Sequence, residues 1–446
     1  MKNKYRWLIL ALTAIIFIFS GIKFFDCGEG EQTVRAIPKE SKIPKPQRII
    51  IRFKEGATKK DKKDFFDKLG AKIIAQDVFG FDIAEWASPE KPITKGIINS
   101  AYTLEVKQRI TIDKYEIEGL AYRKLLPKSG CIPSRPETKI RDKLIVPWYE
   151  RFIENEKAHA FLENAKVSLE PNGIVIIDDG PQMTHKDIEP VIKKNELGHA
   201  IYWINEHNRI KKFMSDHGTH VGCLAAGYRD KNGIDGIAYK KSYLLPLLIN
   251  YNDTGAFFVS DIAIGLKYFR TLELLGRIRF RVVNMSFHIS WPSIIIYQVM
   301  KELDDKIFVI AAGNENLDLD IAKTYPPSWD LPNKIVVGAT REDEHLAYFS
   351  NYGLNSVDIV APGKNITSCA LGDRYMKMSG TSMASPITAG AVSLLFSMDM
   401  NASVNRIKQA LFMGAVSVRF LERKIKYARR LNVNLAVRNF DVILHN

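Results

Sequence analysis

From Val146 onward, short apolar runs of strand length alternate with segments whose apolar residues have helical spacing. A continuously apolar run indicates a strand buried on both faces, as in parallel sheets that are covered by helices. The alternation therefore predicts an α/β domain over residues 146–446, built on a parallel β-sheet flanked by helices. The expected strands are Gly173–Ile177, Ser242–Ile249, Phe280–Met285, Ile307–Ala311 and Lys334–Val337.

Residues 48–124 predict a smaller α+β domain ahead of the large one. Its first segment, Arg48–Lys54, is rich in β-branched residues. Thr58 and Asp61 form a capping-box pattern before a helix that Gly70 is well placed to end. Further strands are expected at Ala71–Ala75 and Phe79–Trp86.

Residues 1–26 have the pattern of an export signal, because a basic start is followed by the apolar run Trp7–Ile22. This run is shorter than the roughly 20 residues that span a bilayer comfortably. No clear A-x-A cleavage site follows it, so a cleaved signal peptide and a retained membrane anchor both stay open. Residues 27–47 and 125–145 combine Pro with charged residues, and we expect two linkers there, the second of them exposed.

The formal net charge of +14 would suit an acidic partner such as nucleic acid. Lys and Arg are spread along the chain instead of gathering in one arm with aromatic residues, so no nucleic-acid partner is expected. The four cysteines match no zinc-binding or dense disulfide spacing. Cys223 and Cys369 both fall in the large domain, where they could pair or remain two buried thiols.

Asp178 and His217 stand at the ends of expected elements. Asp178 follows a buried strand, at the carboxyl edge where open α/β sheets place their sites, although a turn or capping role would also fit it. His217 opens a helix of small residues, where an imidazole is well placed as a general base. His220 could suggest a zinc pair, but the H-E-x-x-H pattern is missing, so no metal site is expected.

Ser382 is expected at the start of another helix, in which Pro386 is tolerated near the first turn. Free N–H groups at a helix start can support an oxyanion, although capping is an alternative role for this serine. A serine needs an imidazole to take its proton, and that imidazole needs a carboxylate to fix its tautomer. The order Asp, His, Ser therefore predicts a catalytic triad of Asp178, His217 and Ser382.

The motifs around these three residues resemble those of the subtilisin-like serine peptidases, or subtilases, and the resemblance extends from Val146 to about Ala436. Asp179 gives a variant of the aspartate motif that the kexin-like branch also shows, although kexin-like specificity does not follow from it. The matching motifs are Ile177–Gly180 with His185 and Asp187, His217–Gly222, and Gly380–Pro386.

By this resemblance, Asn314 supplies the side-chain donor of an oxyanion hole, next to a backbone N–H of the nucleophilic serine. Ser286, Phe287 and Gly313 are expected to bind substrate, the first two in an edge strand that pairs with an extended chain. His288 stands where the family commonly has Gly, and it could narrow or reshape the cleft.

The resemblance implies a serine endopeptidase that hydrolyses proteins or peptides through an acyl-enzyme. It would act outside the cytoplasm, either secreted or anchored through residues 7–22. Residues 48–124 match the position of the family's inhibitory propeptide, with a permanent accessory domain as the alternative. Activation cleavage is expected within residues 125–145.

Asp187 matches one calcium ligand of the family, but the loop Tyr228–Gly233 is built differently. A structural calcium ion is therefore left open without support, and no cofactor is expected. Two other functions also stay open: a catalytically silent binding protein on the same fold, and a membrane-tethered processing peptidase with one dedicated substrate.

Overall fold

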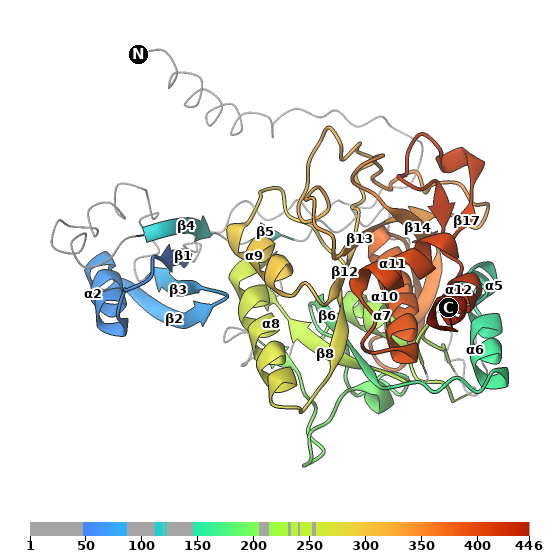
Figure 1. Cartoon of the computed structure of the whole chain (residues 1–446), viewed down its shortest axis with the longest axis horizontal. Helices are drawn as coiled ribbons and strands as arrows, with labels where there is room; N and C mark the ends of the chain where they lie inside the picture. The colour runs from blue at the N-terminus through green and yellow to red at the C-terminus, as the bar shows by residue number, and fades with distance from the viewer. Residues whose placement is uncertain are drawn as a thin grey trace, which may run out of the picture. The chain divides into compact units, whose positions relative to one another are not determined.

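The computed structural model describes residues 48–86, 112–118, 121–122, 146–204, 214–230, 233–239, 241–251 and 256–445 (Figure 1). All of them fall within one compact unit, which spans residues 45–446. The expected export signal and both expected linkers lie outside the described residues.

Within the described residues, the N-terminal part contains a helix and a four-stranded antiparallel sheet with strand order β2-β3-β1-β4. The capping box of Thr58 and Asp61 is present, and Gly70 ends the helix with a φ of 72°. The second strand continues three residues beyond its expected end, to Val78, and Phe79 lies in the following turn with positive φ. The elements are β1 (Arg48–Phe53), α2 (Lys59–Leu69), β2 (Ala71–Val78), β3 (Phe81–Trp86) and β4 (Ile112–Glu118).

A nine-stranded sheet forms the centre of the larger part, in the order β17-β18-β14-β13-β12-β11-β6-β8-β7. Every neighbouring pair is parallel except β17 with β18 at one edge. The predicted α/β fold with a parallel sheet flanked by helices is confirmed (Figure 1). Three strands differ from expectation: β6 is one residue longer at each end, from Asn172 to Asp178, β8 stops at Leu248, and β13 continues to Thr340.

The strands of the large part are β6 (Asn172–Asp178), β7 (Trp203–Ile204), β8 (Ser242–Leu248), β11 (Phe280–Met285), β12 (Ile307–Ala311), β13 (Lys334–Thr340), β14 (Ile359–Pro362), β17 (Val416–Ser417) and β18 (Arg429–Arg430). Outside this sheet lie β5 (Ala121–Tyr122), β9 (Asn250–Tyr251), β10 (Ala256–Phe257), and the hairpin β15 (Ile366–Ala370) with β16 (Arg374–Met378). The helices are α5 (Trp148–Phe152), α6 (Asn155–Asn164), α7 (Asp216–Ala226), α8 (Val259–Leu274), α9 (Ile294–Glu302), α10 (Thr381–Met398), α11 (Val404–Met413) and α12 (Val433–His445), with short 3-10 turns η1 (Glu189–Val191) and η4 (Arg419–Leu421).

The two faces of the sheet explain why β6 is apolar at every position. Ile174 and Ile176 lie in one buried core with α7 and α10, whereas Val175 and Ile177 lie in a second core with α8 and α9. Neither face is left to water, so no polar alternation is needed. Within the described residues, α10 is long and apolar enough to cross a membrane, but 94% of that stretch is buried, as in a core helix of a folded domain.

The small sheet packs against α8 through shared core residues and a buried ion pair. Phe81 belongs to the same apolar cluster as Ile262 of α8. Arg48 is 4% exposed, and its Nη1 donates to Ser260 Oγ at 2.9 Å and to Asp261 Oδ1 at 2.5 Å. Because the ion pair is buried, removing one partner should cost more than breaking an exposed ion pair.

Candidate active site

Asp178 and His217 meet where a strand ends and a helix begins. β6 ends at Asp178, and His217 is the second residue of α7. His217 Nδ1 lies 2.9 Å from Oδ2 and 3.0 Å from Oδ1 of Asp178. An ionised carboxylate only accepts hydrogen bonds, so Nδ1 carries the proton and the neutral ring presents a lone pair at Nε2. Asp178 is 2% exposed, whereas the His217 side chain is 14% exposed.

Two glycines allow the strand end and the helix start to approach each other. Gly180 has a φ of 108°, in the region that favours glycine. A Cβ atom on Gly218 would lie 2.8 Å from the backbone carbon and oxygen of Gly180, which is too close for any side chain. Ser215 secures the contact: its N–H donates to Gly180 O at 3.0 Å, and its Oγ accepts from Gly218 N at 2.8 Å.

Ser382 is the second residue of α10 and exchanges two hydrogen bonds with Ser286. Ser382 Oγ donates to Ser286 O at 3.1 Å, and Ser286 Oγ donates to Ser382 O at 3.0 Å. The hydroxyl proton of Ser382 is thus directed at a backbone carbonyl. Among the described residues, no hydrogen bond joins this hydroxyl to His217. A hydroxyl proton rotates to suit its acceptor, so this direction can change when the carbonyl is engaged by another donor.

Pro386 explains why Ser382 O is available to Ser286. Proline has no N–H, so the helical carbonyl four residues earlier loses its usual donor. The sequence suggested a position near the first turn, but Pro386 is the sixth residue of α10 and lies inside the helix. The serine side chain of position 286 therefore satisfies a carbonyl that the helix leaves open.

Asn314 is held in one orientation by Thr381. Its Oδ1 accepts hydrogen bonds from Thr381 N at 2.8 Å and from Thr381 Oγ1 at 3.0 Å, which leaves Nδ2 as the outward donor. A Cβ atom on Gly380 would lie 3.5 Å from Asn314 Nδ2 and 3.6 Å from Ser382 N. Two N–H donors therefore border one small space beside the serine, a space that exists because residue 380 is glycine.

The three residues expected to bind substrate contribute in different ways. Phe287 is buried, and its ring packs on Phe257 at 5.0 Å between centroids, so its side chain belongs to the core. Ser286 presents its carbonyl to Ser382, as described above. Gly313 has a φ of 104°, and its N–H donates to Thr381 Oγ1 at 3.0 Å. Only the backbone of Phe287 can therefore face a bound chain.

Sequence reasoning missed Thr381 and Glu315 as parts of the site. Glu315 Oε2 accepts from Asn314 N at 3.0 Å and from Asn351 Nδ2 at 2.8 Å, which fixes the loop that carries Asn314. Their positions in the sequence could have indicated these roles, because Thr381 directly precedes Ser382 and Glu315 directly follows Asn314.

His220, the second histidine of its motif, has a structural role. Its Nε2 lies 2.9 Å from Ile366 O of β15, and the residue is fully buried. Burial lowers the pKa of His220 to about 3, so the ring is neutral and Nε2 donates its proton to that carbonyl. The contact ties α7 to the β15–β16 hairpin.

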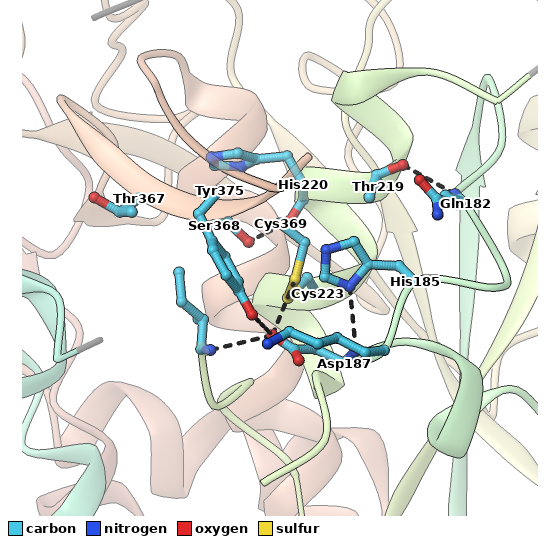
Figure 2. Close-up of a disulfide and its surroundings, with 12 residues drawn as sticks. Gln182, His185, Asp187, Thr219, His220, Cys223, Thr367, Ser368, Cys369 and Tyr375 are labelled. Atoms are coloured by element: carbon cyan, nitrogen blue, oxygen red, sulfur yellow. Dashed lines mark hydrogen bonds between the residues drawn. A yellow bond between two sulfur atoms is a disulfide. The ribbon is translucent and has the colours of Figure 1, made fainter. Parts of the chain in front are cut away.

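A disulfide joins Cys223 of α7 to Cys369 of β15, with their Cα atoms 5.9 Å apart (Figure 2). The sequence had left this pairing open. Beside it, Asp187 Oδ2 accepts a 2.7 Å hydrogen bond from Tyr375, and burial raises the pKa of Asp187. Ligand atoms of His185, Asp187 and Cys369 lie within 4.8 Å of one another, but a sulfur in a disulfide is not the thiolate that a transition metal would take.

Comparison of the sequence with models of known protein families identifies the class of protein to which this fold and these contacts belong. Residues 173–437 match the model of the subtilase family, and this stretch contains Asp178, His217 and Ser382. The chain belongs to the subtilase family.

The sequence is also similar to individual members of this family. The chain is 33% identical over 259 residues to the thermophilic serine proteinase of Bacillus sp. (strain AK1), which covers 57% of this chain and 59% of that protein. It is 31% identical over 275 residues to Subtilisin BL of Lederbergia lenta, covering 61% of this chain and 92% of the relative. Identity to the cell wall-associated protease of Bacillus subtilis (strain 168) is 27% over 381 residues, covering 82% of this chain and 38% of that one.

Some of these relatives are much longer than the shared region. The chain spans 59% of the thermophilic serine proteinase and 31% of Subtilisin-like protease 3 of Plasmodium falciparum (isolate 3D7).

Proposed function

We propose that this subtilase is a serine endopeptidase with Asp178, His217 and Ser382 as its catalytic triad. The observation that carries the proposal is the contact of His217 Nδ1 with the buried carboxylate of Asp178 at 2.9 Å. This contact sets the one tautomer in which Nε2 can take a proton from a serine. Membership of the family and the names of the relatives, which include a serine proteinase and a subtilisin, support the same activity.

In the proposed reaction, Nε2 of His217 takes the Ser382 proton while Oγ attacks the carbonyl carbon of the scissile peptide bond. The oxyanion that forms accepts hydrogen bonds from Asn314 Nδ2 and Ser382 N, the two donors that border the space at Gly380. The imidazolium then gives its proton to the leaving amine as the C–N bond breaks. Water repeats these steps on the acyl-enzyme and releases the acid.

Substrate binding would also prepare the nucleophile. The Ser382 hydroxyl donates to Ser286 O. An extended substrate that lies along this segment brings a backbone N–H, which competes for the same carbonyl. The hydroxyl proton is then released from Ser286 O and can turn toward the imidazole.

We further propose that the enzyme acts on protein or peptide substrates outside the cytoplasm and is made as an autoinhibited precursor. The name of the cell wall-associated relative supports the location, and the apolar run 7–22 supplies an export signal or anchor. The packing of β1–β3 on α8, with Arg48 buried against Asp261, supports residues 48–124 as the inhibitory propeptide. No resident metal or cofactor is included in this proposal.

The proposal is tested with a serine-directed fluorophosphonate probe and a casein hydrolysis assay on purified protein. The probe should label wild type and not Ser382→Ala, and hydrolysis should fall by several orders of magnitude in the variant. N-terminal sequencing of the purified protein would locate the activation cut in the same preparation. Absence of both labelling and hydrolysis in processed wild type would favour a catalytically silent binding protein.

A further inference from the structure

The imidazole of His288 lies beside Gly313, the residue before Asn314, and this contact carries an inference about selectivity. This inference rests on the proposed endopeptidase function and concerns its selectivity. The attacked carbonyl has to lie beside Ser382 Oγ, with its oxygen near Asn314 Nδ2 and Ser382 N. The substrate residue that carries this carbonyl is called P1 below.

Two chain segments border the P1 residue. The first continues from β11 and reaches Ser286, whose carbonyl is 3.1 Å from Ser382 Oγ. The second continues from β12, the parallel neighbour of β11, and reaches Gly313 and Asn314. Any P1 side chain that is directed into the protein must therefore enter between these two segments.

The space between the segments holds the imidazole of His288. Its Cε1 is 2.8 Å from the position that a Cβ on Gly313 would take, so the ring lies directly against the backbone of the second segment. The His288 side chain is 15% exposed. The ring therefore bridges the two segments at the level where a P1 side chain would begin to enter.

Glu315 lies beside the ring. Its Oε1 is 3.8 Å from His288 Nε2, and its Oε2 is held by the backbone N–H of Asn314 at 3.0 Å. Glu315 is also largely buried, with 13% of its side chain exposed. Moving the ring aside would separate it from this largely buried carboxylate, and a side chain that replaced the ring would have to pack against the carboxylate.

We infer that His288, beside Glu315, closes the P1 pocket and restricts cleavage to bonds that follow small residues such as Gly, Ala or Ser. A bulky apolar P1 side chain would have to displace the ring and would meet a carboxylate. A pocket formed by these two side chains thus selects by size and polarity, and His288 is the specificity-determining residue.

The test uses two otherwise identical peptide amides, one with Ala and one with Phe at P1, and processed enzyme whose active sites are counted with a fluorophosphonate. The kcat/KM of wild type should be at least about tenfold higher for the Ala peptide than for the Phe peptide. This is the discrimination by side-chain size that is typical of a hydrophobic pocket. His288→Gly and His288→Ala should shift the Ala-to-Phe ratio toward Phe by about tenfold or more. His345→Gly, at a histidine whose side chain is 44% exposed and stacked on Phe420, should leave the ratio unchanged.

Equal rates on the two peptides in wild type, or an unchanged ratio in both His288 variants, would overturn the inference. Because labelled sites are counted, a poorly folded variant lowers the number of sites and does not alter the ratio. If wild type is neither labelled nor active on either peptide, the proposed endopeptidase function fails, and the inference fails with it.

Discussion

Two donors of Thr381 converge on one oxygen of Asn314: the backbone N–H at 2.8 Å and the hydroxyl at 3.0 Å from Oδ1. The amide of Asn314 can therefore present only its NH₂ group to the space beside Ser382. A donor fixed in advance stabilises a developing negative charge without reorganising when the reaction occurs.

Asn314→Ala should accordingly lower kcat by about 10²–10³-fold, the loss established for the corresponding donor of a subtilisin, with little change in KM. Thr381→Val removes one of the two bonds and should cause a smaller loss of the same kind. Steady-state kinetics on one peptide amide measure both effects, with Asn401→Ala in an exposed turn as the control. A rise in KM with unchanged kcat would assign Asn314 to substrate binding and not to the oxyanion.

The disulfide between Cys223 and Cys369 links residues 146 positions apart and should stabilise the fold by restricting the unfolded chain. We expect the double variant Cys223→Ser, Cys369→Ser to lose about 2–5 kcal/mol of unfolding free energy. Urea unfolding in a Ser382→Ala background, which prevents self-digestion, measures this loss. Reductant should lower the midpoint of the parent and leave the double variant unchanged; an equal midpoint for the parent with and without reductant would mean that the bond does not form.

Arg48→Leu should weaken the attachment of the small sheet to α8, because it removes the buried ion pair with Asp261. Breaking such a pair by removing one member costs about 3–5 kcal/mol. Urea unfolding of the unprocessed Ser382→Ala precursor, followed by circular dichroism, should show the loss. The matched control is Lys63→Ala, which removes an exposed ion pair with Asp67 and should leave the midpoint nearly unchanged. Similar midpoints for the two variants would contradict a buried attachment.

Glu150 should make stability fall as the pH rises toward 8. Burial raises the pKa of Glu150 from 4.5 to about 8, so the folded protein keeps a proton that the unfolded chain loses near pH 4.5. Between these values the folded state binds more protons, and unfolding free energy declines by about 1.4 kcal/mol for each pH unit. Glu150→Gln should remove this slope.

The measurement is the urea midpoint of Ser382→Ala with and without Glu150→Gln at pH 6.5, 7.0 and 7.5. Burial raises the pKa of Asp235 to about 6, so this residue also makes the unfolding free energy fall as the pH rises, but mainly below this range. His220, with its pKa near 3, makes the unfolding free energy rise with pH below pH 6.5. The reason is that the unfolded histidine binds a proton in this range whereas the folded one stays neutral. Parallel pH slopes in the two proteins would show that Glu150 is ionised in the fold.

The positions of Asp178, His217 and Ser382 could be predicted because each stands at a boundary that local sequence defines. Asp178 ends a run that is apolar at every position, and such a run is a strand of the parallel sheet. The other two open helices of small residues, α7 and α10, which pack against each other. The contact of His217 with Asp178 follows from these placements.

Other features depend on contacts between distant residues, and local patterns do not contain them. The side chain of Phe287 turns into the core because Phe257 and its neighbours complete an apolar cluster there. The ring of His288 lies beside Glu315, 27 positions later in the chain. Cysteine spacing could not choose between a disulfide and two thiols, since the choice depends on how close α7 comes to β15.

The contact between Gly180 and Gly218 has a consequence for how this chain can vary. The turn after β6 and the start of α7 touch backbone to backbone, so even alanine at position 218 would force them apart. Neither segment can be remodelled alone, because an insertion beside one of them forces a matching adjustment in the other. Diversity among functional variants should therefore accumulate in the outer strands and surface helices, while these two neighbouring positions change rarely and only in concert.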